Sequence, residues 1–278
     1  MKIGTIPIGG VNPLFLIAGP CVIEDEDSTL RTAEAIGKIA AQLDMGFIFK
    51  SSYLKDNRSS ATAYVGPGLD KGLRILERVR REVGIPVLSD VHCREEVESA
   101  SSVLDVIQIP AYLSQQTRLA VLVGRTGKPV NLKKGQFTGP FEMRNAIGKI
   151  EWTGNRRIMV TERGSCFGYN NLVVDMRSLP ILASLGYPVV FDVTHSVRVY
   201  GTPSGDPSGG EPQYVPYLAC AAVAAGCDGI FIETHEDPAR AKCDACSMLP
   251  ISSLARLLEK LVRIEEAGMR RSNGGESG

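Results

Sequence analysis

The sequence lacks a net charge, because its 31 lysines and arginines are balanced by 31 aspartates and glutamates. It also lacks an apolar run close to the ~20 residues that a membrane-spanning helix needs. Its N-terminal stretch has neither the apolar segment nor the cleavage site of a secretory signal. No overall field favours nucleic acid or membranes, so neither is expected as a partner. Any anion-binding site must come from a local cluster of cations.

The seven cysteines are scattered and odd in number, which is not typical of a disulfide framework. We therefore expect a cytoplasmic protein in a reducing compartment. Cys243 and Cys246 form a single CxxC, but no second CxxC or thioredoxin-like context accompanies them, so we interpret this motif as neither a redox centre nor a zinc knuckle. The others that we interpret as core or bystander residues are Cys93, Cys166, Cys220 and Cys227.

The first apolar run is not followed by the GxGxxG motif that is typical of a doubly wound dinucleotide-binding sheet. Eight short apolar runs alternate instead with segments of helical periodicity. This alternation favours an α/β fold with buried parallel strands, a (β/α)8 TIM barrel, and leaves the doubly wound sheet as the alternative. The apolar runs are residues 14–19, 46–50, 86–91, 105–110, 129–133, 157–162, 188–193 and 229–233, and the clearest helical segments are 69–83, 214–226 and 251–265.

No linker divides the chain, so we expect one barrel domain over residues 1–278. Residues 1–12 are expected to contain a short β-hairpin ahead of the barrel. Residues 201–212 are rich in Gly, Pro and Ser, and are expected to form an irregular loop that is either a lid or an idle surface segment. Residues 269–278 are expected to be a flexible tail.

Active sites of such barrels lie at the C-terminal ends of the strands. Each of the eight predicted strands ends in a side chain capable of chemistry. One such residue alone is unremarkable, since strand ends meet solvent, but eight together indicate a site. They are Cys21, Lys50, Asp90 with His92, Gln108, Lys133, Arg163, Asp192 with His195, and Glu233.

Five cations are expected around one mouth: Lys50, Lys55, Arg58, Lys133 and Arg163. Arginine donates forked hydrogen bonds to phosphate or carboxylate, and lysine supplies a point charge. The motif KDNRSS at residues 55–60 is therefore interpreted as a cradle for a phosphorylated substrate rather than as a solvated loop.

Cys21, His195 and Glu233 follow the first, seventh and eighth strands, which are neighbours in a closed barrel, and Asp244 lies in the next loop. Mixed sulfur, nitrogen and oxygen ligands suit Zn²⁺, Fe²⁺ or Mn²⁺. The alternative is that Cys21 is a small buried hydrophobic residue. Spacing alone does not decide between a metal site and a packed thiol.

Several stretches resemble the 3-deoxy-D-manno-octulosonate 8-phosphate synthases, and the order and spacing agree over roughly residues 13–251. KDNRSS matches the segment that separates this family from the 3-deoxy-arabino-heptulosonate 7-phosphate synthases. The matching stretches are AGPCVIE (18–24), FKSS with KDNRSS (49–60), GPGLDKGLRIL (66–76), SDVH (89–92), DVIQIPAYL (105–113), NLKKGQF (131–137), ERGSCFGYNNLVVDM (162–176), FDVTHSV (191–197), GIFIETHEDPARAKCD (229–244) and SMLPI (247–251).

The resemblance implies a homotetrameric (β/α)8 barrel that condenses phosphoenolpyruvate with D-arabinose 5-phosphate and water, in the biosynthesis of lipopolysaccharide. It also implies the metal-dependent class, because that class has Cys in the motif AGPC where metal-independent members have Asn. The implied metal ligands are Cys21, His195, Glu233 and Asp244.

Residue by residue, the resemblance assigns two sets of substrate contacts and a catalytic set. Phosphoenolpyruvate contacts are implied for Lys50, Lys55, Gln108, Lys133 and Arg163. Pentose-phosphate contacts are implied for Asn57, Arg58 and Ser59, and Asp90 matches a polar group near the reacting carbons. The expected catalytic residues are Lys55, Asn57, Asp90, His195 and Asp244.

The chain departs from the family at the pentose-phosphate end. The family usually has an Arg after the fourth strand that reaches a neighbouring subunit's substrate, and this chain has Gln115 there. Arg118 lies three positions later and is a candidate replacement. Asp56, Cys93 and the stretch 208–213 also differ from the usual pattern.

Three alternatives follow: an acceptor other than arabinose 5-phosphate, a Schiff-base aldolase using Lys50 or Lys133, and a non-catalytic sugar-phosphate binding protein.

Overall fold

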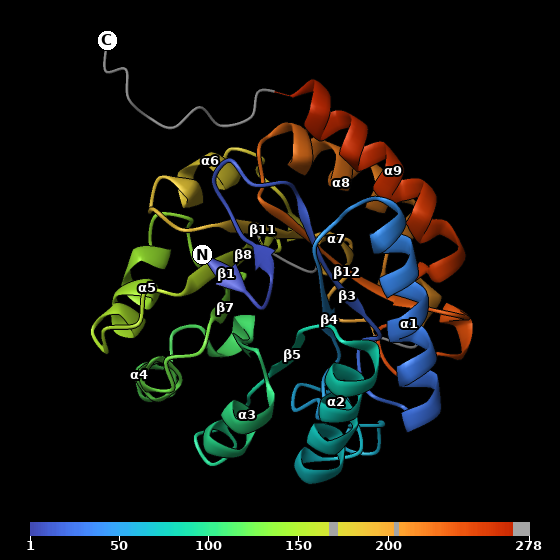
Figure 1. Cartoon of the computed structure of the whole chain (residues 1–278), viewed down its shortest axis with the longest axis horizontal. Coiled ribbons are helices and arrows are strands. Elements are labelled where there is room, and N and C mark those ends of the chain that lie inside the picture. The colour runs from blue at the N-terminus through green and yellow to red at the C-terminus, as the bar shows by residue number, and fades with distance from the viewer. Residues whose placement is uncertain (167–171, 203–205, 269–278) are drawn as a thin grey trace.

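A computed structural model describes residues 1–166, 172–202 and 206–268 (Figure 1). Eight parallel strands form a closed ring, in which β12 pairs with both β11 and β3. The predicted (β/α)8 barrel is confirmed, because a doubly wound sheet would leave two open edges. The strands are β3 (Phe15–Gly19), β4 (Phe47–Lys50), β5 (Val87–Asp90), β6 (Val106–Ile109), β7 (Val130–Lys133), β8 (Ile158–Glu162), β11 (Val189–Asp192) and β12 (Gly229–His235).

The longer helices lie outside the ring of strands (Figure 1), whereas the one-turn helix α7 carries His195, which lines the cavity at the strand ends. The helix α2 has the bounds that its periodicity predicts, and it ends at Gly84, whose φ of 75° permits the left-handed conformation of a helix C-cap. Asp25 caps the first helix by accepting a hydrogen bond from the Ser28 backbone N–H at 2.8 Å. The helices are α1 (Glu26–Gln42), α2 (Leu69–Val83), α3 (Val97–Val103), α4 (Thr117–Arg125), α5 (Met143–Glu151), α6 (Ser178–Ala183), α7 (Val193–Ser196), α8 (Val215–Ala224) and α9 (Ile251–Ala267).

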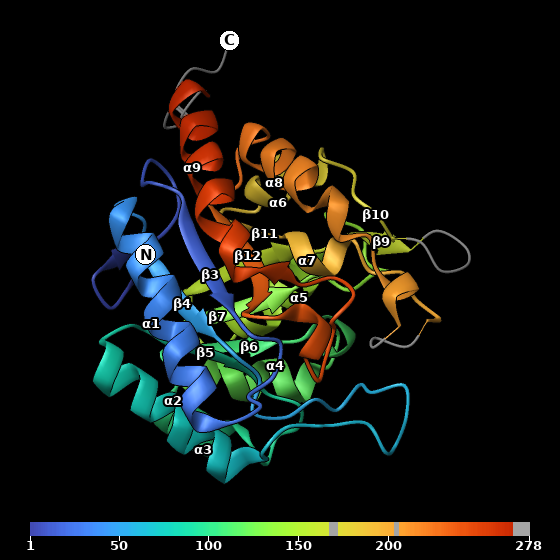
Figure 2. The ribbon, with the colours of Figure 1, turned by 90° about the vertical axis from the view of Figure 1, so that its right-hand side faces the viewer.

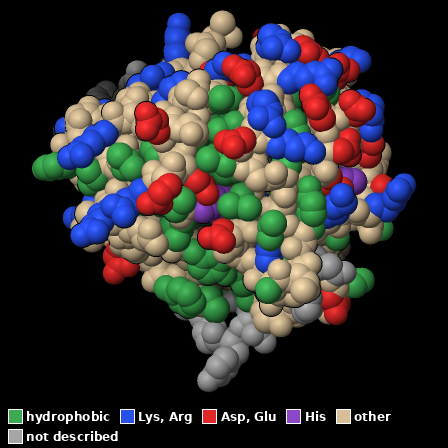
Figure 3. Space-filling model, turned by 90° about the horizontal axis from the view of Figure 1, so that it is seen from below, with side chains coloured by type: hydrophobic (Ala, Val, Ile, Leu, Met, Phe, Trp, Pro, Cys, Tyr) green, Lys and Arg blue, Asp and Glu red, His purple; other side chains and the backbone are tan. Residues whose placement is uncertain are grey.

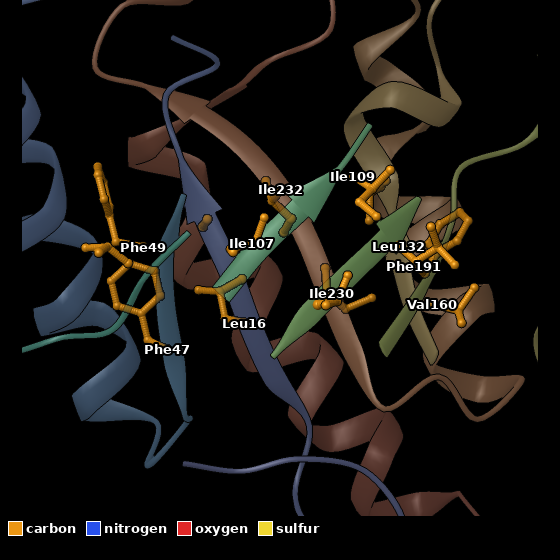
Figure 4. Close-up of a cluster of buried hydrophobic side chains, with 14 of the residues drawn as sticks. Leu16, Phe47, Phe49, Ile107, Ile109, Leu132, Val160, Phe191, Ile230 and Ile232 are labelled. Carbon is orange, nitrogen blue, oxygen red and sulfur yellow. The ribbon is translucent and has the colours of Figure 1, made fainter. Parts of the chain in front are cut away.

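Alternation of side chains along each strand produces two hydrophobic cores. Leu16 and Ala18 of β3 belong to the outer core between strands and helices, while Phe15 and Ile17 belong to the inner core of the barrel. Figure 4 shows part of the outer core, including Leu16 and residues from the neighbouring strands. Burying one such side chain contributes about 1.5–3 kcal/mol, which explains why these strands read as continuous apolar runs.

The predicted N-terminal hairpin is confirmed as β1 (Lys2–Ile3) paired with β2 (Ile6–Pro7). Ile3, Ile6 and Ile8 pack against the inner core, so the hairpin closes the N-terminal end of the barrel. Figure 2 shows this hairpin at one end and the long loops that follow the strands at the other. The interior of the barrel is therefore covered at this end, and its open end lies at the C-terminal ends of the strands.

One loop prediction was partly wrong. Residues 201–212 were expected to contain no regular structure, but Pro207–Gly209 forms a 3₁₀ turn and Pro212–Tyr214 forms another. The first is capped by the Asp206 side chain, which accepts from the Ser208 N–H at 2.8 Å. Residues 203–205 of this expected lid and the expected tail at 269–278 lie outside the described residues.

Three further short strands were not anticipated: β9 (Ser165–Cys166) pairs with β10 (Leu172–Val173), and β13 (Leu249–Pro250) extends beside β12. Acidic and basic side chains are intermingled over the face in Figure 3, in keeping with the zero net charge. Among the described helices, none has both the length and the apolar character that a membrane span requires.

Candidate active site and metal-ligand cluster

A cavity of about 580 Å³ opens at the C-terminal ends of the strands. All five cations expected at the mouth line it. The residues that line it without having been assigned a role from the sequence include the polar side chains of Tyr112, Arg198, Tyr200 and Thr202. The expected residues that line it are Lys50, Lys55, Asn57, Arg58, Ser59, Asp90, Gln108, Lys133, Arg163, His195 and Asp244.

Lys50 stands at the floor of this cavity, where β4 ends. Its Nζ donates to Glu233 Oε1 at 2.9 Å and to the Cys21 carbonyl at 3.0 Å, and both charged side chains are buried. Gly19 permits this close packing, since a Cβ built there would lie 2.0 Å from the Lys50 carbonyl oxygen. Lys50 thereby connects the strand ends that carry Cys21 and Glu233.

Asp192, which the sequence placed at a strand end without a role, organises two of the assigned residues. Its carboxylate accepts from Lys133 Nζ and lies 2.9 Å from His195 Nδ1. Burial opposes ionisation of Asp192, but the charges of His195 and Lys133 outweigh it and lower the pKa of the carboxyl. The contact at Nδ1 is one of proximity and charge, since this nitrogen makes no hydrogen bond of good geometry among the described residues. The other ring nitrogen, Nε2, lies on the side of Glu233 and Asp244.

His195 Nε2 lies 3.8 Å from both Glu233 Oε2 and Asp244 Oδ2, and Cys21 Sγ lies 3.2 Å from Asp244 Oδ2. The four residues expected as ligands are thus together. Buried Glu233 Oε2 has no hydrogen-bond partner among the described residues, which is costly unless another group contacts it. The donor set of one thiol, one imidazole and two carboxylates fits a borderline divalent ion.

The discounted CxxC contributes to this cluster. Cys243 Sγ lies 3.0 Å from Cys21 Sγ, and both thiols are buried. Burial, the hydrogen bond with Cys243 and the negative charge of Asp244 raise the pKa of the Cys21 thiol well above its usual range. No local pattern in the sequence could have indicated this contact, because the two cysteines are 222 residues apart.

Arg163 is buried beside the cavity, although guanidinium groups are seldom buried without a partner. Its Nη1 has no hydrogen-bond partner among the described residues, and its guanidinium lies 5.7 Å from the ring centroid of Tyr200. Lys133 Nζ lies 3.6 Å from the Phe231 ring centroid. These two buried cations flank the cavity, and an anionic ligand would satisfy the free donor of Arg163.

Asp90 is held by a buried chain of polar groups behind the cavity. Ser52 Oγ donates to Asp90 Oδ1 at 2.5 Å, and His92 Nε2 lies 3.1 Å from Asp90 Oδ2. The other ring nitrogen of His92 lies 3.3 Å from Glu96 Oε2, which accepts from the Tyr53 hydroxyl at 2.7 Å. Burial opposes the charge on His92, but the two carboxylates outweigh it and raise its pKa to about 9.

The KDNRSS segment lies along the cavity mouth, as expected. Lys55 is buried, and its backbone N–H donates to the Val65 carbonyl at 2.7 Å. Burial disfavours its charge, but the surrounding acidic groups, Cys21 and Asp90 foremost, raise its pKa well above the usual range. Arg58 Nη1 donates to Cys243 Sγ at 2.8 Å, whereas Asp56 is exposed and does not line the cavity.

The chain matches the DAHP synthetase I family over residues 1–269. The chain belongs to this family. It is 55% identical to a protein of Geobacter sulfurreducens over 95% of this chain and 97% of that protein, and equally so to one of Trichlorobacter lovleyi. It is 58% identical to a protein of Syntrophobacter fumaroxidans over 92% of this chain and 88% of that protein. All three relatives are named 2-dehydro-3-deoxyphosphooctonate aldolase.

Arg118, the candidate replacement for the expected arginine, does not line the cavity of its own chain. It lines a separate surface hollow with Arg94, Glu95 and Arg125. Gln115 is exposed, and its carbonyl accepts from Lys149 Nζ at 2.8 Å. The two residues therefore lie outside the cavity of the same chain.

Proposed function

We propose that the protein condenses phosphoenolpyruvate with D-arabinose 5-phosphate and water, forming 3-deoxy-D-manno-octulosonate 8-phosphate and inorganic phosphate. The observation that carries this proposal is that five cations and two potential metal ligands, His195 and Asp244, line one cavity. The other two potential ligands are close by, since Cys21 Sγ lies 3.2 Å from Asp244 Oδ2 and Glu233 Oε2 lies 3.8 Å from His195 Nε2. The name shared by relatives that are more than half identical supports it.

Phosphoenolpyruvate fits the deep, buried part of the cavity. Its phosphate and carboxylate need several fixed cations, and Arg163, Lys133 and Lys50 are buried there with little freedom to move. Gln108 is oriented because Asn131 Nδ2 donates to its amide oxygen at 2.9 Å. Such preorganised donors bind the phosphate and carboxylate groups without reorganisation at the moment of reaction.

The pentose phosphate fits the outer part. Asn57 and Ser59 are exposed at the mouth, and Arg58 is half-buried beside them. A phosphate at the far end of a five-carbon sugar would contact this loop while the aldehyde reaches the floor. The aldehyde carbon would then face C3 of phosphoenolpyruvate.

In the proposed reaction, C3 of phosphoenolpyruvate attacks the aldehyde carbon, water adds to C2, and the resulting intermediate loses phosphate by cleavage of its C2–O bond. Lys55 and Asp90 carry opposite charges near this point, and Asn57 orients the sugar. His195 and Asp244 hold their ligand atoms toward the reacting centre. A divalent ion held by Cys21, His195, Glu233 and Asp244 would supply Lewis-acid polarisation of the aldehyde or orient the water.

The family resemblance supports three further parts of the proposal. We infer a homotetramer, a cytoplasmic location and a role in the inner core of lipopolysaccharide. We also infer that Zn²⁺, Fe²⁺ or Mn²⁺ is the ion, because the ligand set contains both soft and hard donors.

The proposal is tested by phosphate release from phosphoenolpyruvate with each of three acceptors: arabinose 5-phosphate, erythrose 4-phosphate and ribose 5-phosphate. Turnover should be fastest with arabinose 5-phosphate. Faster turnover with another aldose phosphate would assign a different acceptor, which the Gln115 substitution keeps open. Binding of both substrates without phosphate release under any metal would instead indicate a non-catalytic protein.

A Schiff-base mechanism is the second candidate, because burial lowers the pKa of Lys133 as an imine-forming lysine requires. Lys133 Nζ is nevertheless paired with the Asp192 carboxylate, whose negative charge favours the protonated form of the lysine. A protonated amine cannot attack a carbonyl carbon. Borohydride treatment with phosphoenolpyruvate and acceptor should therefore yield no covalent adduct. An adduct on Lys133 or Lys50 would replace the proposed mechanism.

A further inference from the structure

Cys243 lies at the edge of the ligand cluster. Its Sγ, the Cys21 Sγ and an oxygen of Asp244 all lie within 4.8 Å of one another. Cys21 and Cys243 are both almost fully buried, together with Val22 and Met248. The two sulfurs are therefore shielded from solvent on the side away from the cavity.

The backbone explains how adjacent residues reach one site. Asp244 has a φ of 49°, a left-handed conformation that aspartate tolerates better than most residues. The Ser247 N–H donates to the Asp244 carbonyl at 3.0 Å, which completes a turn. The side chains of two successive residues usually point in different directions. In this turn, however, the Cys243 sulfur and an Asp244 carboxylate oxygen lie within 4.8 Å of each other.

The second cysteine of the motif lies apart from the cluster. Cys246 Sγ accepts from Arg198 Nη1 at 2.8 Å and belongs to neither group of potential ligands. Cys243 Sγ accepts from Arg58 Nη1 at 2.8 Å. A guanidinium N–H at a thiolate is the kind of outer contact that stabilises a sulfur ligand.

We propose that Cys243 supplies a second thiolate to the divalent ion bound by Cys21, His195, Glu233 and Asp244, which gives this site a preference for thiophilic ions such as Zn²⁺ and Cd²⁺ over Mn²⁺. This inference rests on the metal site of the proposed function. The adjacent buried thiols of Cys21 and Cys243 beside Asp244 support the second thiolate. Glu233 Oε2, which has no hydrogen-bond partner among the described residues, supports the ion itself.

The geometry permits this ligation with small movements. Zinc–sulfur bonds are about 2.3 Å long, so two thiolates that subtend about 90–120° at a five-coordinate ion lie about 3.3–4.0 Å apart. The observed sulfur separation is 3.0 Å, so the two side chains must part by at most about 1 Å. Binding would release the thiol protons, because thiolates are the ligating form.

The test uses the full chain, stripped of metal and titrated with Cd²⁺ alone. Thiolate–cadmium charge transfer absorbs in the ultraviolet in proportion to the number of Cd–S bonds. We expect Cys243→Ser and Cys21→Ser each to lower this absorption by about half, and the matched control Cys246→Ser to leave it unchanged. Wild-type absorption retained in Cys243→Ser, with complete loss in Cys21→Ser, would overturn the inference.

X-ray absorption at the zinc edge makes the same test without a variant. The zinc-loaded wild type should show two sulfur neighbours at about 2.3 Å, and one sulfur neighbour would overturn the inference. Failure of the wild type to bind Zn²⁺ or Cd²⁺ would overturn the metal site and this inference together. Two sulfur neighbours without phosphate release under any metal would support the inference and contradict the proposed function.

Discussion

The charged state of His92 offers a direct test of the buried network behind Asp90. His92 lies between the carboxylates of Asp90 and Glu96, with 8% of its side chain exposed. Lys55 and Lys50 face Asp90 from the cavity side, and the Tyr53 hydroxyl contacts Glu96. Replacing His92 with Gln removes the central cation and retains a similar volume.

The magnitude follows from the pKa of His92, which is raised from 6.5 to about 9. At 1.36 kcal/mol per pKa unit, this difference corresponds to about 3 kcal/mol. Because the folded value lies above the unfolded one, the stabilisation is fully present below pH ~6.5 and is lost as the pH rises through about 9. The excess stability of the wild type over His92→Gln should therefore shrink by about 3 kcal/mol between pH ~5.5 and pH ~9.5.

Urea unfolding, followed by circular dichroism at both pH values, measures this difference. Comparing wild type with variant at each pH cancels the titration of shared groups that lie away from His92. His235→Gln is a suitable control, since it replaces another histidine outside the network. An excess stability that is the same at both pH values would refute the assignment of a charged His92.

Three further predictions concern the site. Gly19→Ala should lower the melting temperature and the activity, because the added Cβ would collide with the Lys50 carbonyl oxygen. The control Gly148→Ala, whose added Cβ enters open space, should change neither, and equal melting temperatures for the two variants would contradict the packing argument. Asp192→Asn should weaken Zn²⁺ binding about 10–100-fold by calorimetry, as for other carboxylates that orient a histidine ligand, and unchanged affinity would remove it from the site. Arg58→Ala should raise the KM for arabinose 5-phosphate about 10–100-fold, because losing a hydrogen bond from a charged group costs ~1.5–3 kcal/mol. A comparable rise in the KM for phosphoenolpyruvate would contradict the assignment of the outer part of the cavity to the pentose phosphate.

Most of the fold could be predicted, because parallel barrel strands are buried on both sides and leave continuous apolar runs. The strand predicted at residues 46–50 is observed at Phe47–Lys50, and the helix predicted at 69–83 is α2. The hairpin was predicted as well. The 3₁₀ turn at Pro207–Gly209 was not, because it depends on one proline and one capping aspartate rather than on periodicity.

The site was predictable where its residues stand directly at strand ends, since barrel topology alone brings those together. Lys133 and Arg163 are of this kind. Cys243 was missed because its position depends on how the loop after β12 folds back over β3, and no short-range pattern records that path. Asp192 had a signal: a carboxylate three residues before a candidate histidine ligand at the same strand end.

The most direct test of the central claim is phosphate release from phosphoenolpyruvate and arabinose 5-phosphate by the chelator-stripped protein, before and after addition of Mn²⁺, Zn²⁺ or Fe²⁺. We expect that stripping abolishes phosphate release and that at least one of these ions restores it in the wild type but not in Glu233→Gln. Full activity after verified removal of metal would contradict the metal site and leave Cys21 as a packing residue, and no release under any ion would contradict the proposed reaction.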